Sequence, residues 1–313
     1  METQLPLVSV IMATYNRANL VVRAIESVLN QSYKNIELII VDDGSTDNTT
    51  EVLRNINDSR IRVHKHEVNK GATGAKNSGL KLIKGEWFTI YDSDDEMVQD
   101  AIESMMNIPL HFDPAVTAVT CNGWDPLSNT LTGQGLNEDC YLHGNEIMPA
   151  CKGDFWGIIK TSLLNNDSFN ENLIGCESTL WFKLSERANG YYIHKALSII
   201  HVEGNDRVTT SKVSLEKKIL HYESIINEEL FLKITRKFDP EGFYDLCKNG
   251  LLIMRLNKNK PLASKYYELL KTTPDNSILT YMIYKYDFSL AMYKIYSKIM
   301  SSVRKITRSL KSL

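Results

Sequence analysis

Four strand-like segments in the first hundred residues each end in a polar loop. They are residues 7–13 (LVSVIMA), 36–41 (IELIIV), 61–67 (IRVHKHE) and 86–92 (EWFTIYD). Their length and β-branched content predict strands, and the residues between them have helical periodicity. The first two are nearly continuous apolar runs, which is typical of strands that helices cover on both faces. The pattern predicts an α/β fold of repeated βαβ units around a mostly parallel sheet.

The polar loops TYN, DDGS, NKGATGAKN and DSDDE follow these four segments in order. Right-handed crossovers between parallel strands bring the loops after each strand to one edge of the sheet. Ligands of open α/β sheets bind at that edge, outside the carboxyl ends of the strands. We therefore expect the four loops to form one binding site.

The acidic loop Asp92-Ser93-Asp94-Asp95 directly follows the fourth predicted strand. Neighbouring carboxylates repel one another unless a cation or hydrogen bonds compensate them. Mg²⁺ and Mn²⁺ prefer such oxygen ligands, and Mg²⁺ often takes one or two carboxylates together with substrate phosphates. The alternative is a solvated acidic turn before a helix, but the position at the binding edge favours a metal site.

Two further loops can meet a nucleotide. A carboxylate of the segment 42–45 (DDGS) can accept a hydrogen bond from a base N–H or a ribose hydroxyl. In the segment 69–77, glycines precede a helix and Lys76 lies one turn inside it, an arrangement that can face a phosphate. The segment matches neither GxxxxGK[ST] nor GxGxxG. Each segment also has a purely structural explanation. Segment 42–45 could be a turn that caps the following helix, and segment 69–77 could be the start of a helix with a solvated lysine.

Together these segments resemble the inverting family 2 glycosyltransferases of the GT-A fold, over residues 5–100. The resemblance rests on VSVIMATYNR, SVLNQSYKNIELIIVDDGSTDNT, NKGATGAKNSGL and GEWFTIYDSDDE. It implies a Rossmann-like, mostly parallel sheet flanked by helices. It also implies transfer of a sugar from a UDP-sugar or another NDP-sugar, assisted by a divalent cation, Mn²⁺ or Mg²⁺.

The resemblance also assigns donor and metal residues. The residues implied around the nucleotide sugar are Ala13, Thr14, Tyr15, Asn16, Asp43, Lys76, Asp92, Ser93 and Asp94. Asp92 and Asp94 match the DxD motif. Asp94 or Asp95 would bind the metal that bridges the diphosphate.

The catalytic base of the family falls in FNENLIGCESTLWFKL, where members carry a Glu-Asp pair. Glu177 is the one carboxylate left in that pair. It falls on the aspartate of the pair when the segment is aligned through Leu180-Trp181, and on the glutamate when it is aligned through Phe169. The alternative is a carboxylate favoured only by the helix dipole. By the same resemblance Asp154 and Trp156 shape the acceptor pocket, although Trp156 could instead be a core residue.

Three histidines lie in a predicted strand or in a late loop. His201 begins the segment HVEGNDRVT, which resembles a late loop that closes over the donor, with Glu203 where histidine is common and Arg207 nearby. His64 and His66 are expected to be surface residues of a strand. Residues 123–150 are rich in glycine and asparagine and are expected to form an irregular loop region.

The 313 residues have a formal net charge of −2, so no global basic field indicates nucleic acid. The five cysteines include no CxxC pair, which favours a reducing cytosol over a disulfide framework. The N-terminus lacks the basic region of a signal peptide, and no apolar run reaches the ~20 residues of a spanning helix. These features predict a soluble or peripheral cytoplasmic protein.

The C-terminal segment is basic and amphipathic. No acidic residue follows Asp287, whereas six basic residues do. Apolar residues recur at helical spacing from Ile295 to Leu313. Such a helix can lie on the cytoplasmic face of an anionic membrane, or can pack on its own domain with a solvated basic face. We expect a transferase domain over residues 1–210 and a helical region over residues 211–313.

The sequence thus predicts a metal-dependent inverting glycosyltransferase of the hexosyltransferase type. Its acceptor is expected to be a glycan, lipid-linked or not, in cell-surface polysaccharide or glycoprotein synthesis. A nucleotidyltransferase is the first alternative, but ATYNRAN lacks a glycine-rich phosphate signature. A degenerate transferase-like binding module is the second.

Overall fold

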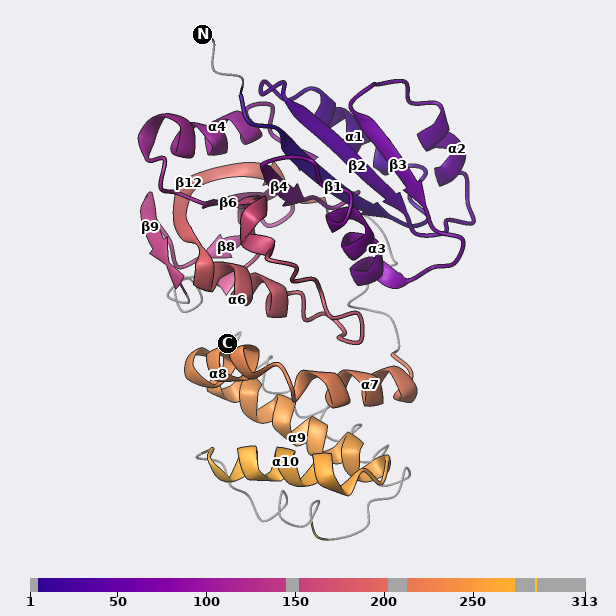
Figure 1. Ribbon diagram of the computed structural model, residues 1–313, viewed down its shortest axis with the longest axis vertical. Helices are drawn as coiled ribbons and strands as arrows, with labels where there is room; N and C mark the ends of the chain where they lie inside the picture. Colours follow the sequence, from indigo (N-terminus) through magenta and orange to yellow (C-terminus); the bar gives the residue numbers. More distant parts are fainter. Residues whose placement is uncertain (1–4, 145–151, 202–212, 274–284, 286–313) are drawn as a thin grey trace. The chain divides into compact units, whose positions relative to one another are not determined.

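The computed structural model describes residues 5–144, 152–201, 213–273 and 285. The chain divides into two compact units (Figure 1). The first, here called the sheet unit, comprises Met1–Glu171 and Glu177–Thr210. The second, the helical unit, comprises Asn172–Cys176 and Ser211–Leu313. The five residues 172–176 therefore belong to the helical unit although they lie within the sequence of the first.

A mixed sheet of ten strands, counted over the described residues, forms the centre of the sheet unit. Its main path runs β3-β2-β1-β4-β11-β6-β12-β5. The first four strands of the path are parallel: β1 (Val8–Thr14), β2 (Ile36–Asp42), β3 (Ile61–Lys65) and β4 (Trp87–Ile90). Their carboxyl ends consequently meet at one edge. The α/β fold expected from the sequence is confirmed.

The remaining strands extend the sheet on the other side of β4. They are β5 (Glu96–Met97), β6 (Ala118–Asp125), β11 (Phe155–Lys160) and β12 (Asn189–Ile199). β11 runs antiparallel between β4 and β6, and β12 runs parallel to β6. The sheet is therefore mixed on this side.

The region expected to be an irregular loop contains several short strands. They are β7 (Thr130–Leu131), β8 (Gly133–Gln134) and β9 (Cys140–His143), and β10 (Lys152–Gly153) follows just beyond the region. β7 pairs with β6 and β9 pairs with β12, whereas β8 and β10 pair with each other. The expectation was wrong for these segments because strands of two to four residues are too short to show a period.

Helices cover both faces of the sheet. The α-helices that the structure describes in this unit are α1 (Val21–Leu29), α2 (Thr49–Arg54), α3 (Gly71–Leu80), α4 (Ala101–Asn107) and α6 (Ser178–Arg187). Val10 and Met12 of β1 share a buried cluster with residues of α1 and α4, whereas Ile11 packs with residues of α6. Since successive strand side chains point to opposite faces, β1 must be apolar at nearly every position. This explains the continuous apolar run in the sequence.

The described part of the helical unit consists mainly of four helices: α7 (Leu215–Ile225), α8 (Glu229–Phe238), α9 (Pro240–Leu256) and α10 (Lys260–Lys271). Side-chain oxygens of Ser214, Asp239 and Asn259 accept backbone hydrogen bonds at the starts of α7, α9 and α10. Phe243 and Tyr266 are fully buried in the core, to which Leu173 also belongs.

Within the described residues, no helix combines the length and the apolar character needed to cross a membrane. The basic amphipathic segment from Ile295 to Leu313 lies outside the described residues.

Candidate active site

The loops after β1 and β2 are joined by the side chain of Asn16. Asn16 adopts a left-handed conformation with φ of 52°, which asparagine tolerates better than most residues. Its Oδ1 accepts hydrogen bonds from the backbone N–H groups of Thr46 and Asp47, at 2.9 and 3.3 Å. Its own N–H donates to Ser45 Oγ at 3.0 Å. Asn16 therefore fixes the shape of the predicted nucleotide edge.

The two adjacent aspartates at the end of β2 have different roles. Asp42 is fully buried and accepts hydrogen bonds from the Ser45 N–H and the Thr50 hydroxyl, so it holds its own turn. Asp43 faces the third loop, where its carboxylate accepts the Lys70 and Gly71 N–H groups at 2.9 and 2.8 Å. The two carboxylates are therefore not interchangeable.

A buried histidine completes the environment of Asp43. His66 Nδ1 lies 2.7 Å from Asp43 Oδ1, and its Nε2 lies 2.9 Å from the hydroxyl of Ser78. His66 is only 3% exposed, so its expected place on the surface was wrong, whereas His64 is exposed. A carboxylate offers about four acceptor sites, and three donors already meet Asp43. Within the described parts of the chain, Oδ2 accepts just one of these three hydrogen bonds, from Gly71.

The loops after β2 and β3 approach each other closely at two glycines, Gly44 and Gly71. Gly44 has a φ of 74°, and a Cβ there would come within 3.1 Å of the Asn69 backbone nitrogen. Gly71, whose φ is 82°, donates its N–H to Asp43 at the start of α3. Both positions require the left-handed region that glycine enters without steric cost.

Lys76 connects the acidic loop to the predicted base. Its Nζ lies 2.8 and 2.9 Å from the two carboxylate oxygens of Glu177 and 3.7 Å from Asp92 Oδ1. Burial lowers the pKa of Lys76, but the charges of Asp92 and Glu177 outweigh burial and raise it above its usual value. Lys76 therefore stays charged between Asp92 and Glu177, two carboxylates that are far apart in the sequence.

Asn77, the neighbour of Lys76 on α3, holds the chain that leads to Glu177. Its side-chain amide exchanges two hydrogen bonds of 2.9 Å with the backbone of Phe169 and donates a third to Glu171. Asn77 is 5% exposed. Glu177 itself precedes the first residue of α6, where the positive end of the helix dipole favours a carboxylate. Sequence reasoning did not identify Asn77.

The acidic loop after β4 places its three carboxylates in different environments. Asp92 is exposed, whereas Asp94 lies 3.9 Å from the guanidinium of Arg17 and its carbonyl accepts a hydrogen bond from Arg23. Asp95 is buried and accepts the His201 N–H at 3.0 Å. Burial, with the charges of Asp92 and Asp94, raises the pKa of Asp95 to about 7.

This electrostatic pattern fits a divalent cation. The pKa of Asp95 is raised first by burial and then by the charges of Asp92 and Asp94, so a cation beside this loop would favour its ionised form. Among the described residues no group of three or more His, Cys, Asp or Glu side chains is arranged to hold a metal. One or two carboxylates suffice, however, where substrate phosphates supply the other ligands.

The other predicted donor residues line the same edge. Ala13 and Thr14 end β1, and the buried Oγ1 of Thr14 has no hydrogen-bond partner in the described part of the protein. Tyr15 is 42% exposed, while Ser93 is buried. A buried hydroxyl without a partner is costly, so a ligand at this edge would find a donor and acceptor at Thr14.

The two predicted acceptor residues differ. The Trp156 indole N–H donates to Thr89 Oγ1 at 2.8 Å, and its ring contacts Tyr91 edge to face at a centroid distance of 5.0 Å. Trp156 also packs against the main core cluster, as its alternative assignment anticipated. Asp154 is exposed.

The late-loop residues are described only in part. His201 is described, and its ring Nε2 lies 3.4 Å from Glu96 Oε2. Glu203 and Arg207 lie outside the described residues. The histidine tied to Asp43 and the arginines beside Asp94 were missed from sequence. Arg17 carried a signal, because it follows the TYN loop directly.

Comparison with known proteins places this geometry in a family. Residues 9–166 match the family model described as "Glycosyl transferase family 2". A "GalNAc(5)-diNAcBac-PP-undecaprenol beta-1,3-glucosyltransferase" of Campylobacter jejuni is 36% identical over 214 residues, which cover 66% of this chain and 68% of the relative.

A second relative is similar over a shorter part. The Escherichia coli protein named "UDP-Glc:alpha-D-GlcNAc-diphosphoundecaprenol beta-1,3-glucosyltransferase WfaP" is 46% identical over 101 residues, 32% of this chain and 40% of the relative. The match thus spans less than half of that relative's length.

The fold also has a solved counterpart. The crystal structure of S. aureus TarS 1–349 in complex with UDP-GlcNAc superposes with a TM-score of 0.64 at 20% identity. The superposition covers 86% of this chain and 82% of that one. This likeness shows a shared GT-A fold.

Proposed function

The chain belongs to glycosyl transferase family 2, and we propose that it moves a sugar from a UDP-sugar to a glycan carried on a polyprenyl diphosphate, with inversion at the anomeric carbon. The observation that carries this proposal is the group formed by Lys76, Glu177 and Asp92 at the carboxyl edge of the parallel strands. In the proposed reaction this group would provide a cation for the donor diphosphate and a carboxylate for the acceptor hydroxyl.

The donor would lie along the loops after β1, β2 and β4. Asp43 Oδ2 would supply an acceptor for a base or ribose, and the Thr14 hydroxyl, which has no hydrogen-bond partner among the described residues, would supply a donor. Ala13, Tyr15, Asn16 and Ser93 would shape the same surface. The choice of UDP rests on the similarity to proteins whose names or bound ligands contain UDP-Glc or UDP-GlcNAc.

Asp94 and Asp95 would hold a Mn²⁺ or Mg²⁺ ion together with the diphosphate. The bound ion supplies positive charge that stabilises the departing nucleoside diphosphate. Lys76 adds a fixed positive charge beside Asp92 at the same place.

Glu177 would act as the base. Its carboxylate takes the proton of the acceptor hydroxyl as that oxygen bonds to the anomeric carbon, while the bond from this carbon to the diphosphate breaks. Lys76 orients Glu177 through both carboxylate oxygens. Asp154 would contact the acceptor, and Trp156 would shape the acceptor pocket from the edge of the main core cluster.

The acceptor follows from the names of the relatives, which specify glycans on diphosphoundecaprenol. Such an acceptor requires the enzyme to work at a membrane surface, and the basic segment from Ile295 to Leu313 would attach it to the cytoplasmic face. In this proposal the transfer reaction takes place on residues 1–210. The lipid carrier of the acceptor and the membrane surface would be contacted by residues 211–313.

The test is calorimetric titration of UDP and a panel of UDP-sugars with Mn²⁺ and with EDTA, followed by transfer assays on synthetic glycosyl diphosphate lipids. We expect saturable UDP binding with Mn²⁺ that EDTA or Asp94→Ala removes. Asp100→Ala, an exposed aspartate just beyond the acidic loop, is the matched control and should bind normally.

A folded protein that bound no UDP species with any metal would overturn the donor assignment. UDP binding without transfer or hydrolysis of any donor would replace the enzyme by a binding module. Release of diphosphate from a nucleoside triphosphate would indicate a nucleotidyltransferase instead.

A further inference from the structure

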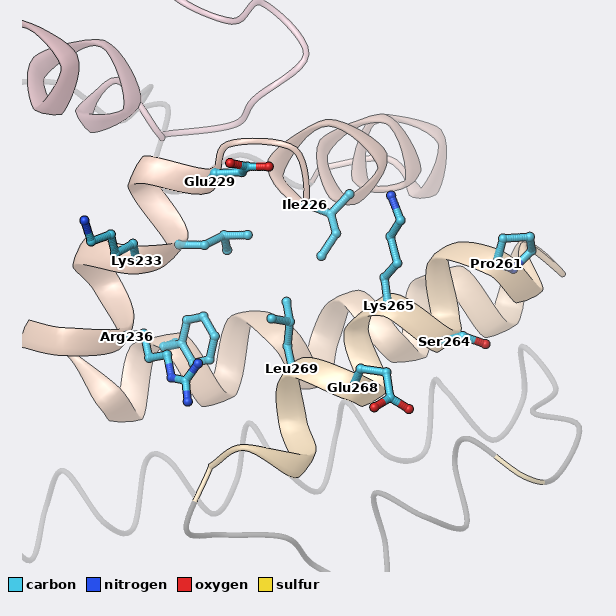
Figure 2. Close-up of a pocket in the computed structure, with 11 residues that line it drawn as sticks. Ile226, Glu229, Lys233, Arg236, Pro261, Ser264, Lys265, Glu268 and Leu269 are labelled. Atoms are coloured by element: carbon cyan, nitrogen blue, oxygen red, sulfur yellow. The ribbon is translucent and has the colours of Figure 1, made fainter.

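The helical unit contains an open pocket of its own, with a volume of about 620 Å³ (Figure 2). Every residue that lines it belongs to this unit and comes from the end of α7 or from α8, α9 and α10. Pockets that hold small molecules have volumes of about 300–1,000 Å³. The pocket is thus large enough for a ligand and shares no lining residue with the candidate active site.

Apolar side chains form much of its lining. Ile226, Leu232, Phe243 and Leu269 contribute from four successive helical segments. In Figure 2, Ile226 and Leu269 point toward each other across the opening. Phe243 is 1% exposed, so this wall is anchored in the core of the unit. An apolar group of a ligand would be removed from water here.

Basic side chains surround the apolar wall. Lys233 and Arg236 lie one turn apart on α8, and Lys265 projects from α10 toward the opening (Figure 2). Among the described residues neither Lys233 nor Lys265 has an ion-pair partner within 4.0 Å. The two lining acids are Glu229 and Glu268, and Glu268 is paired with Lys271 at 2.6 Å. The rim therefore retains unneutralised positive charge.

We propose that this pocket binds the polyprenyl diphosphate part of the acceptor, with isoprene units against the apolar wall and the diphosphate at Lys233, Arg236 and Lys265. The pocket combines an apolar wall with basic side chains at its rim. This combination suits an amphiphile that has an anionic head group. The assignment rests on the proposed lipid-linked acceptor. It gives the helical unit a binding function separate from donor recognition.

The size of the pocket limits the contact to a few isoprene units. The remainder of a long polyprenyl chain would stay in the bilayer. Binding would therefore depend on the diphosphate and on the isoprene units next to it. A short soluble polyprenyl diphosphate would contain every group that the pocket contacts. This makes the proposal testable without a membrane.

The test uses the full chain and farnesyl diphosphate as the probe, with farnesol and inorganic diphosphate as the two partial probes. Calorimetry should give saturable binding of farnesyl diphosphate. Each partial probe should bind at least tenfold more weakly, because it offers only one half of the interaction.

Variants then separate the charged and apolar contributions. Lys233→Glu combined with Lys265→Glu should weaken farnesyl diphosphate at least tenfold and leave the weak farnesol binding unchanged. Leu269→Gln should weaken both. The matched control combines Lys237→Glu with Lys260→Glu, which places the same charges on α8 and α10 outside the pocket and should change nothing.

The outcomes distinguish this inference from the proposed function. Failure of UDP binding with intact farnesyl diphosphate binding would refute the transferase and leave the pocket assigned. Normal UDP binding without saturable farnesyl diphosphate binding would refute the pocket alone. Binding of phosphatidylglycerol vesicles that the double variant weakens, without binding of soluble farnesyl diphosphate, would overturn the proposal in favour of a membrane surface.

Discussion

The ammonium group of Lys76 lies within hydrogen-bonding distance of both carboxylate oxygens of Glu177, at 2.8 and 2.9 Å. The same group is 3.7 Å from Asp92. One cation on α3 therefore lies between the acidic loop that follows β4 and the carboxylate that precedes α6. Donor chemistry and acceptor chemistry meet at this lysine in the proposed reaction.

Replacing Glu177 by Gln should remove the base and keep its shape. We expect kcat for transfer to fall by about 10²–10⁴-fold, the usual contribution of a general base. Calorimetric UDP affinity should stay unchanged, since Glu177 does not contact the donor in this assignment. Glu186→Gln, on the exposed face of α6, is the control and should transfer normally. A Glu177→Gln enzyme of normal rate would require another base.

Replacing Lys76 by Met should weaken the UDP-sugar affinity by about tenfold or more, because the diphosphate would lose this cation while the carboxylate of Asp92 stayed beside it. Lys76→Arg should recover most of the affinity, since the charge is retained. Lys81→Met, just beyond the same helix, serves as the control. Equal affinities in Lys76→Met and the control would exclude Lys76 from the donor site.

His66 gives a third prediction. His66→Ala should weaken UDP affinity by about tenfold, the equivalent of one hydrogen bond to a charged group, because Asp43 would lose the contact that orients it. His64→Ala is the matched control, since His64 contacts His66 edge to face from the exposed surface. Identical calorimetric affinities for the two variants would show that Asp43 needs no such support.

Glu37 predicts a pH dependence of stability away from the site. Burial alone would raise its pKa, but hydrogen bonds from Ser9, the Lys84 N–H and Arg62 outweigh burial and lower it. A lowered folded-state pKa means that this stabilisation is present above the unfolded value of about 4.3 and is lost as the pH falls through the folded-state pKa.

Glu37→Gln should therefore lower the free energy of unfolding by about 2–4 kcal/mol at pH 7, measured by urea denaturation, and by less at pH 3. Glu51→Gln, an exposed residue of α2, should show no such difference. A Glu37→Gln effect of the same size at both pH values would contradict the ionic origin of the stabilisation.

The strands and their loops could be predicted because local sequence carries the information. β1 and β2 are apolar at almost every position since both of their faces are covered, and the loops that end them are polar. The pairing of Asp43 with His66 could not be predicted, because the loop after β3 folds back toward β2 only in the tertiary structure. His66 looked like a surface residue from its strand alone.

The contacts of Glu177 could not be predicted from the sequence either. Its place before a helix was visible in sequence, but its partner Lys76 is 101 positions away and its support by Asn77 depends on packing. Trp156 could not be assigned from its residue type, since a stacking and a packed tryptophan look alike until the hydrogen bond to Thr89 is known. The short strands β7 to β10 carried too few residues for a period.

The five residues 172–176, which precede Glu177, pack with the helical unit and not with the sheet that surrounds them in sequence. Leu173 shares its core with Phe243 and Tyr266. The polypeptide therefore passes between the units three times, after Glu171, Cys176 and Thr210. The helical unit consequently cannot be exchanged between related proteins by joining two sequences at one position. A chimera joined near residue 210 would inherit a segment of one parent whose apolar contacts belong to the other.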